Sequence, residues 1–313
     1  MQIMIRIAHD FWRSNGFLWR ATRIIIAVCV VLLTLIMAFE DKLIYFPTKY
    51  PDGVWALPDA RPARGETFPQ IEDCHFVASD GVKLHGWYCS PLLSEAGGSV
   101  PVAAEMVLLW LHGNAGNISH RYEMIRAMMK LPVRVFIIDY RGYGKSEGKP
   151  TERGLYLDAR AAWDYLVNQR GVSPDRIVIF GKSLGGVPAI DLASKVEPAG
   201  LIVQSSFTSA SDMAASLLPF FPGALLQTKM DSVSKIQNVH CPKLFIHSPA
   251  DEVVPYVLGR RLFEAAPEPK EFYDVKGSPH NSTYLIGGKP YFEALRRFLH
   301  SCLKPADPGN GLR

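Results

Sequence analysis

The chain has 313 residues, 48% of them hydrophobic and 20% charged, and a formal net charge of +4 at pH 7. This length and balance predict one large α/β domain with a sizeable core and an appendage. The basic residues are scattered and form no basic helix or aromatic-interleaved stripe, which excludes a nucleic-acid partner. The five cysteines form no CxxC pair and no metal-like spacing, so we expect no metal site.

An uncharged apolar run covers residues 24–39 and approaches the roughly 17 to 20 residues that cross a bilayer. Arginines dominate its N-terminal side, whereas Glu40 and Asp41 follow it. The positive-inside rule predicts that residues 1–40 form a cytoplasmic N-terminus and a single-pass transmembrane anchor, with the rest of the chain extracytoplasmic. The alternatives are a cleaved signal peptide, a lipoprotein signal and a buried core helix. A signal peptide would need a small-x-small cleavage site, which is missing after the run, and a lipoprotein signal would need a small residue before Cys29. A buried core helix would show a polar side, and this run shows none.

Residues 41–70 are rich in proline, aspartate and aromatic side chains, and we expect an irregular connecting segment there. The stretches 71–77 and 82–88 then predict an antiparallel hairpin around an Asp-Gly turn. Cys74 and Cys89 lie on these two strands. The parity of a tight turn favours two buried free thiols over a disulfide bridge.

From residue 106 onward, short apolar strands alternate with longer helical stretches. The predicted strands are 107–111, 133–138, 177–180, 201–204, 243–246 and 271–275, and the predicted helices are 119–130, 151–171, 184–196, 257–265 and 290–303. This alternation predicts an α/β fold with a mostly parallel central sheet and helices on both faces. We place this domain at residues 71–304 and a C-terminal tail at 305–313. Functional groups in such sheets gather beyond the carboxyl ends of the strands.

Ser183 lies in Gly181-Lys-Ser-Leu-Gly185, a GxSxG element directly after an apolar strand. In this pattern the serine occupies a strained strand-to-helix turn, and glycines are needed because neighbouring backbone comes too close for a Cβ. The helix behind it directs free N–H groups and its positive dipole end toward a developing oxyanion. We therefore predict that Ser183 is an acyl-transfer nucleophile. The alternative is a glycine-rich turn that merely contains a serine.

A serine nucleophile requires a general base and a carboxylate that orients the base. Asp251 is the first acid in the loop after the fifth predicted strand, and His280 lies in a constrained loop after the sixth. This order of serine, acid and histidine accompanies this kind of elbow. We predict that Asp251 and His280 act with Ser183. His247 is the competing histidine but is expected to pack at a strand edge, and Glu252 is expected to face elsewhere.

The oxyanion hole is expected to use two backbone N–H groups. One belongs to Leu184, the residue after the nucleophile. The other comes from the loop His112-Gly-Asn-Ala-Gly-Asn117, whose glycines allow N–H groups to turn inward. We choose Asn114 as this second donor, with Ala115 next, and an ordinary glycine turn is the alternative.

Residues 205–241 form an insertion between two predicted strands. It contains an apolar stretch, 217–222, that two prolines interrupt, followed by Leu225 and Leu226. This composition fits a small cap over the site or a surface that touches lipid. A core helix is the alternative.

Together these motifs resemble the α/β-hydrolase superfamily over roughly residues 43–303. The sequence looks most like a single-pass, membrane-anchored branch related to depalmitoylase-like hydrolases and to serine aminopeptidase-like sequences. The resemblance rests on Ile44-Tyr-Phe-Pro47, Asp80-Gly81, Gly86-Trp87, His112-Gly-Asn-Ala-Gly-Asn117, Asp139-Tyr-Arg-Gly-Tyr-Gly144, Gly181-Lys-Ser-Leu-Gly-Gly186, Asp251, Val254-Pro255 and His280. It implies the triad Ser183, Asp251 and His280, and neither a metal nor an organic cofactor. One departure is that depalmitoylase-like enzymes hold to the membrane through a lipidated, cysteine-rich N-terminus, whereas this chain has Cys29 inside its apolar run.

We expect a serine hydrolase that cleaves a carboxylic ester or thioester of a small-molecule or lipid acyl substrate, close to a bilayer. A peptidase that releases N-terminal residues would need an acidic pocket for the free amine, and the insertion offers only Asp212 and Asp231 as acids. A non-catalytic scaffold on the same fold would have no use for the complete set of serine, aspartate and histidine. The sequence leaves acyl-chain preference and oligomeric state open.

Overall fold

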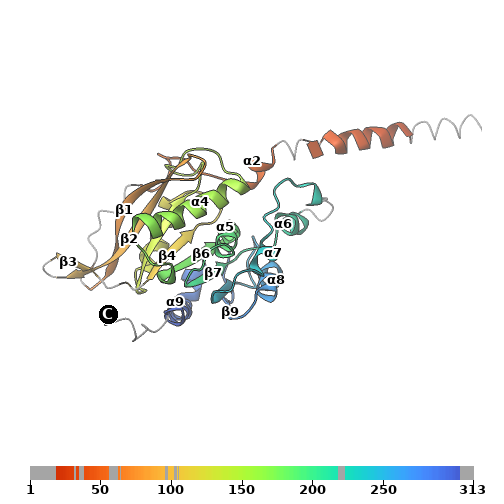
Figure 1. Cartoon of the computed structure of the whole chain (residues 1–313). Coiled ribbons are helices and arrows are strands. Elements are labelled where there is room, and N and C mark those ends of the chain that lie inside the picture. The colour runs from red at the N-terminus through yellow and green to blue at the C-terminus, as the bar shows by residue number, and fades with distance from the viewer. Residues whose placement is uncertain are drawn as a thin grey trace, which may run out of the picture.

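The computed structural model describes residues 19–31, 33–34, 39–55, 63, 65–95, 98–101, 104, 106–217 and 223–303. They contain a nine-stranded sheet in the order β1-β2-β5-β4-β6-β7-β8-β9, with β3 paired to β2. Helices cover both faces of this sheet (Figure 1). Every neighbouring pair from β5 to β9 is parallel. The prediction of an α/β fold with a mostly parallel central sheet is therefore confirmed.

The strands are β1 (Thr67–Val77), β2 (Lys83–Glu95), β3 (Gly98–Pro101), β4 (Met106–Leu111), β5 (Val133–Asp139), β6 (Ile177–Lys182), β7 (Gly200–Gln204), β8 (Lys243–His247) and β9 (Lys270–Asp274). All six residues of β6 are buried, as expected for a central strand covered on both faces. Along β6, Ile177 and Ile179 point into one half of the core, whereas Val178 and Phe180 point into the other. The alternation of side chains therefore supplies both layers from one strand.

The predicted hairpin is the antiparallel pair β1 and β2. Cys74 lies opposite Gly86 and Cys89 lies opposite Ile71, so the two cysteines are not cross-strand partners. Both are buried free thiols. Because β1 begins at Thr67, the expected domain boundary at residue 71 falls inside a strand.

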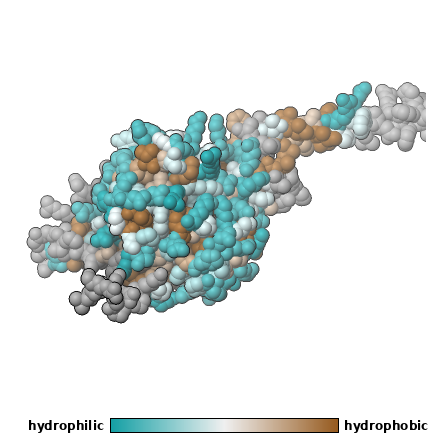
Figure 2. Space-filling view, viewed as in Figure 1, coloured by the Kyte–Doolittle hydropathy of each residue, from teal (hydrophilic) through white to brown (hydrophobic). Residues whose placement is uncertain are grey.

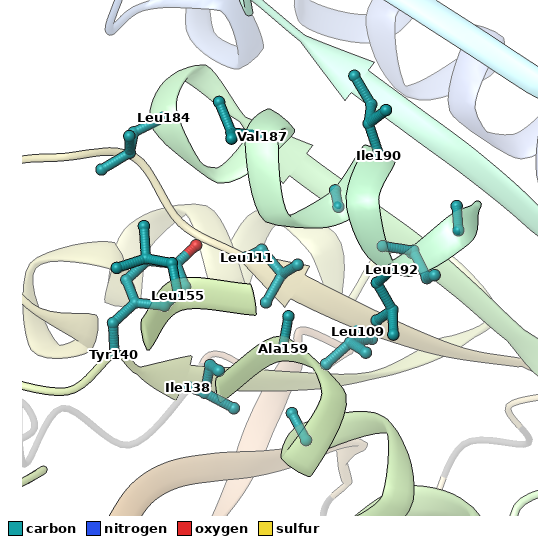
Figure 3. Packing of buried hydrophobic residues seen from close by; sticks show 14 of the residues in the cluster. Leu109, Leu111, Ile138, Tyr140, Leu155, Ala159, Leu184, Val187, Ile190 and Leu192 are labelled. Carbon is teal, nitrogen blue, oxygen red and sulfur yellow. The ribbon is translucent and has the colours of Figure 1, made fainter. Parts of the chain in front are cut away.

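The helices that cover the sheet are α3 (Tyr122–Met128), α4 (Glu152–Asp164), α5 (Gly186–Ala193), α8 (Tyr256–Ala265) and α9 (Thr283–Cys302). Helix α4 begins where the sequence indicates, because the Thr151 side chain accepts a hydrogen bond from Gly154 N. Helix α9 starts earlier than expected and contains the non-helical residue Gly288, before Pro290. Apolar residues of α4, α5 and α8 pack on one face of the sheet, and those of α3 and α9 pack on the other. Figure 3 shows Leu155 and Ala159 of α4 and Val187 and Ile190 of α5 against β4.

The described part of the predicted anchor is helical at residues 19–31 and 33–34 and projects from the body (Figure 1). Its apolar side chains are exposed and form a brown stretch in Figure 2. No helix among the described residues is both long enough and apolar enough to cross a membrane. Residue 32 and residues 35–38 of the predicted span lie outside the described residues, as do residues 1–18 and the predicted tail at 305–313.

The connecting segment, which we expected to be irregular, includes the end of a short helix, α2 (Glu40–Ile44), and the start of β1. Two parallel bridges tie it to loops of the sheet, pairing Pro47 with Gly116 and Lys49 with Gly144. The buried Glu40 carboxylate accepts hydrogen bonds from Gln227 N at 2.9 Å and Thr228 N at 2.7 Å. Helix α2 is thereby held against the insertion.

The insertion contains α6 (Ala210–Leu217), η5 (Gly223–Leu225) and α7 (Ser232–Ile236). In α6 only Ala210 is buried, so this helix is not a core helix. It lies at the same end of the molecule as α2 (Figure 1). Residues 218–222, which belong to the predicted apolar stretch, lie outside the described residues.

Candidate active site

Ser183 occupies the sharp turn between β6 and α5, with a φ of 54°, in the left-handed region that non-glycine residues rarely adopt. The backbone packs too tightly here for larger neighbours. A Cβ on Gly185 would lie 2.0 Å from Leu111 O, and one on Gly181 would lie 2.6 Å from Gly185 O. Ser206 Oγ donates a hydrogen bond of 2.9 Å to Ser183 O. The elbow is thus strained and is supported by the segment that follows β7.

His280 and Asp251 meet beyond the carboxyl ends of β8 and β9. His280 Nδ1 lies 2.9 Å from Asp251 Oδ1 and 2.8 Å from Oδ2. The Asp251 side chain is fully buried, and its Oδ1 also accepts hydrogen bonds from Val253 N and Val254 N. With Nδ1 engaged by the carboxylate, the histidine presents Nε2 as the atom that can accept a proton.

Burial alone would raise the pKa of the Asp251 carboxyl. Hydrogen bonds from His247 and His280, followed by the charge of His280, outweigh burial and hold this pKa well below its ordinary value. The carboxylate therefore stays ionised and can stabilise an imidazolium at His280. His247 packs at the end of β8 as expected, but its Nε2 also lies 3.4 Å from Asp251 Oδ2.

Glu252 is a residue that the sequence analysis misjudged. Instead of facing elsewhere, its Oε2 accepts a hydrogen bond of 2.9 Å from His280 N. Consecutive acids thus hold the histidine at two points, Asp251 at the ring and Glu252 at the backbone. The sequence signal was the Asp-Glu pair itself, but only the approach of the histidine loop shows how it is used.

Asn114 lies at the carboxyl end of β4, next to the elbow. Its Oδ1 accepts hydrogen bonds from Phe46 N at 3.1 Å and Tyr143 Oη at 3.0 Å, and its Nδ2 donates to Ile44 O. Among the described residues, the N–H groups of Asn114 and Leu184 donate none of the backbone hydrogen bonds in turns and loops. The side chain therefore fixes the loop against the segment after α2, and both predicted N–H donors are free of such bonds.

Ser183 lies where two cavities meet. One, of about 340 Å³, is almost entirely apolar, and α2, α6 and the insertion supply most of its wall. Its lining residues are Leu43, Ile44, Phe46, Asn114, Ser183, Leu184, Phe207, Ala210, Met213, Ala214, Leu217, Leu226, Met230, Val253 and Val254. The shape and chemistry of this cavity suit a hydrocarbon chain attached to a carbonyl at Ser183.

The second cavity, of about 350 Å³, is more polar and includes His280. Its lining residues are Phe46, Gly113, Asn114, Ala115, Arg121, Lys182, Ser183, Val253, His280 and Asn281. The structure thus brings Ser183, His280 and Asn114 around one space, with Asp251 directly behind the histidine. The sequence analysis did not single out Arg121 or Lys182.

Lys182 is 9% exposed, and burial, followed by the charge of Arg121, lowers its pKa to about 8. Burial also lowers the pKa of Arg121. The signal in the sequence was a lysine inside an otherwise apolar strand and elbow. Within the described ranges, the site included, no group of three or more His, Cys, Asp or Glu residues is arranged to hold a metal ion.

A serine elbow after a central parallel strand, with an aspartate and a histidine from later loops beside it, is the arrangement of an α/β hydrolase. Residues 103–226 match the family described as Serine aminopeptidase, S33. The α/β hydrolase domain-containing protein WAV2 of Arabidopsis thaliana is 35% identical over 293 residues, 87% of this chain and 91% of WAV2. The α/β hydrolase domain-containing protein 17B of Homo sapiens is 38% identical over 202 residues, which are 63% of this chain and 67% of the human protein.

The chain therefore belongs to the α/β-hydrolase family. The esterase Pf2001 of Pyrococcus furiosus has a similar fold, with a TM-score of 0.60 and 22% identity, covering 75% of this chain and 93% of the esterase. At that identity the likeness concerns the fold alone. The relatives thus support the α/β-hydrolase part of the predicted resemblance, and the structural comparison supports the fold.

Proposed function

We propose that this protein is a membrane-anchored serine hydrolase that cleaves carboxylic esters or thioesters of apolar acyl groups. The observation that carries the proposal is the position of Ser183 between an apolar cavity and a polar cavity that contains His280. The acyl chain occupies the first cavity, and the alcohol or thiol occupies the second. The hydrogen-bonded pair of His280 and Asp251 supports the same assignment.

In the first half of the reaction, Ser183 Oγ attacks the carbonyl carbon while His280 Nε2 takes the hydroxyl proton. The C–O or C–S bond then breaks, and His280 gives that proton to the departing alcohol or thiol. In the second half, water attacks the acyl-enzyme and gives a proton to His280. The acyl–Oγ bond breaks, the acid leaves, and Ser183 recovers the proton. The N–H groups of Asn114 and Leu184 stabilise the oxyanion in both halves.

The test is labelling of the full-length, detergent-solubilised protein with a fluorophosphonate probe. Wild type should react, while Ser183→Ala and His280→Ala should not. Hydrolysis of nitrophenyl esters with acyl chains of increasing length then measures the predicted esterase activity. Labelling that persists in Ser183→Ala would remove this serine from the mechanism.

The family match also raises the possibility of an aminopeptidase. Such an enzyme needs negative charge near the site to hold the ammonium group of a free N-terminus. The charged residues at the polar cavity are instead Arg121 and Lys182, which would repel that group. Aminoacyl amides should therefore be poorer substrates than acyl esters, and the reverse preference would favour the peptidase.

Membrane anchoring is part of the proposal. It rests on the apolar run at residues 24–39, the arginines before it, and the exposed apolar side chains of the described helix. Protease treatment of sealed vesicles tests it: the catalytic domain should be digested only from the extracytoplasmic side. Release of the protein by an alkaline carbonate wash would contradict an integral anchor.

A further inference from the structure

The two cavities at Ser183 have different chemical roles in acyl transfer. His280 must deliver a proton to the leaving atom, so the leaving group must lie on the side of the histidine. His280 lines the polar cavity and not the apolar one. If Ser183 carries the acyl-enzyme as proposed, the polar cavity is the leaving-group subsite, and its chemistry determines which alcohols or thiols are released.

This subsite holds two cations that form no ion pair with a residue that the structure describes. The Lys182 side chain makes no hydrogen bond or ion pair with any residue that the structure describes, although only 9% of the residue is exposed. Arg121 donates from Nη2 to Ala115 O, while its buried Nε has no hydrogen-bond partner among the described residues. No Asp or Glu belongs to the described wall of the cavity.

The Asp251 carboxylate does not neutralise this pair. The charge of Asp251 favours the protonated form of Lys182, but burial and the repulsion from Arg121 outweigh it and lower the pKa of Lys182. The carboxylate is already engaged by His280 and by two backbone N–H groups. A buried cation without a partner is unfavourable, and the partly buried Arg121 guanidinium on the same small cavity adds repulsion to that cost. An arrangement of this kind is suited to a ligand that brings the negative charge with it.

We propose that the natural substrate has an anionic leaving group, an alcohol or thiol bearing a carboxylate or a phosphate, which Lys182 and Arg121 bind beside Ser183. This inference rests on the proposed function and adds the chemistry of the departing half. Arg121 supplies a planar donor set that matches two anion oxygens, and Lys182 supplies a point charge. The substrate is thus apolar at its acyl end and negatively charged at the other.

The test compares matched substrates that differ only in charge. One pair consists of octanoyl esters of a nitrophenol that carries either a carboxylate or a neutral carboxamide on the ring. The second pair is octanoylglycerol phosphate against octanoylglycerol, and it distinguishes phosphate from carboxylate as the preferred anion. The full-length, detergent-solubilised protein should show a kcat/KM about tenfold or more higher for the anionic member of at least one pair.

The variants Lys182→Gln and Arg121→Gln, alone and combined, should bring this ratio close to one. Their kcat/KM for the neutral member should fall less than their kcat/KM for the anionic member, and labelling of Ser183 by the fluorophosphonate probe reports that the site is folded. Lys289→Gln on α9 is the matched control, because it removes one positive charge from an 87% exposed side chain that lines neither cavity. It should leave both activities unchanged.

Three results would overturn the inference: no preference in wild type, an equal loss on both members of a pair in the variants, or a ratio that survives the double substitution. Hydrolysis of the neutral ester without charge preference would remove the inference but leave the proposed hydrolase intact. Failure of Ser183 to react with a fluorophosphonate would instead overturn the proposed hydrolase itself, and this inference with it.

Discussion

Lys182 should destabilise the folded protein at neutral pH, and Lys182→Met should relieve that effect. The lysine is buried, and its pKa falls from an ordinary 10.5 to about 8. At about 1.4 kcal/mol for each pKa unit, this lowering corresponds to roughly 3 kcal/mol against folding when both states are protonated. Methionine keeps the apolar stem and removes the charge. Allowing for local relaxation, we expect a gain of about 1 to 3 kcal/mol at pH 7.

The sign of the pH dependence follows from the direction of the shift. Between pH 8 and pH 10.5 the unfolded chain holds the Lys182 proton while the folded chain has lost it, so this contribution to stability rises with pH. The free-energy cost of burying the Lys182 charge is therefore complete below pH 8 and absent above pH 10.5. The advantage of Lys182→Met should therefore be largest at pH 7 and shrink across that window.

Thermal unfolding of the full-length protein in detergent, followed by tryptophan fluorescence from pH 7 to pH 10.5, measures this effect. A gain of about 1 to 3 kcal/mol corresponds to a rise in Tm of roughly 2 to 8 °C at pH 7. Lys289→Met, on an exposed part of α9, should change Tm little at any pH in the range. A Lys182→Met variant that unfolds earlier than wild type at pH 7, or whose gain does not vary with pH, would refute the reasoning.

Three further substitutions address the site. Asp251→Asn should lower kcat for ester hydrolysis by about a thousandfold or more, because the carboxylate no longer orients and stabilises the His280 ring. Activity near that of wild type would exclude Asp251 from the mechanism. Met213→Trp should fill part of the apolar cavity, so the rate of octanoyl ester hydrolysis should fall about tenfold while that of acetyl ester hydrolysis is retained. An equal loss for both esters would place the acyl chain elsewhere. Gly185→Ala should destabilise the fold by about 3 kcal/mol, because its Cβ would lie 2.0 Å from Leu111 O, and an unchanged Tm would show that the elbow can relax.

Some of the site could be predicted because its signals are local in sequence. The GxSxG turn requires small residues wherever the backbone approaches itself, and Gly181 and Gly185 meet that requirement. Asp251 and His280 each follow a strand in a loop of the right character, and the topology of a parallel sheet brings such loops to one edge. The pairing at 2.8 Å is a consequence of that topology.

Other features could not be predicted because they depend on residues far apart in sequence. Glu40 reaches the insertion across 187 residues to Gln227 and 188 residues to Thr228. Arg141 pairs with Asp80 and with Asp158 of α4, and not with the neighbouring Asp139. Asp139 contacts His85 instead, at 2.8 Å. Each choice depends on which carboxylate the packed chain brings within reach, and several were equally available in the sequence.

The sequence by itself determined the α/β class, the strained serine turn and the two loops that hold Asp251 and His280, because hydrophobic periodicity and glycine placement act over short distances. Only the tertiary structure decided that the space at Ser183 is divided into an apolar and a cationic part. Lys182 enters that space from the elbow and Arg121 from the end of η1 (Ile118–Arg121), 61 residues earlier. The electrostatics of a cavity depend on which charges converge on it and how far water is excluded, and neither property belongs to any one segment of the chain.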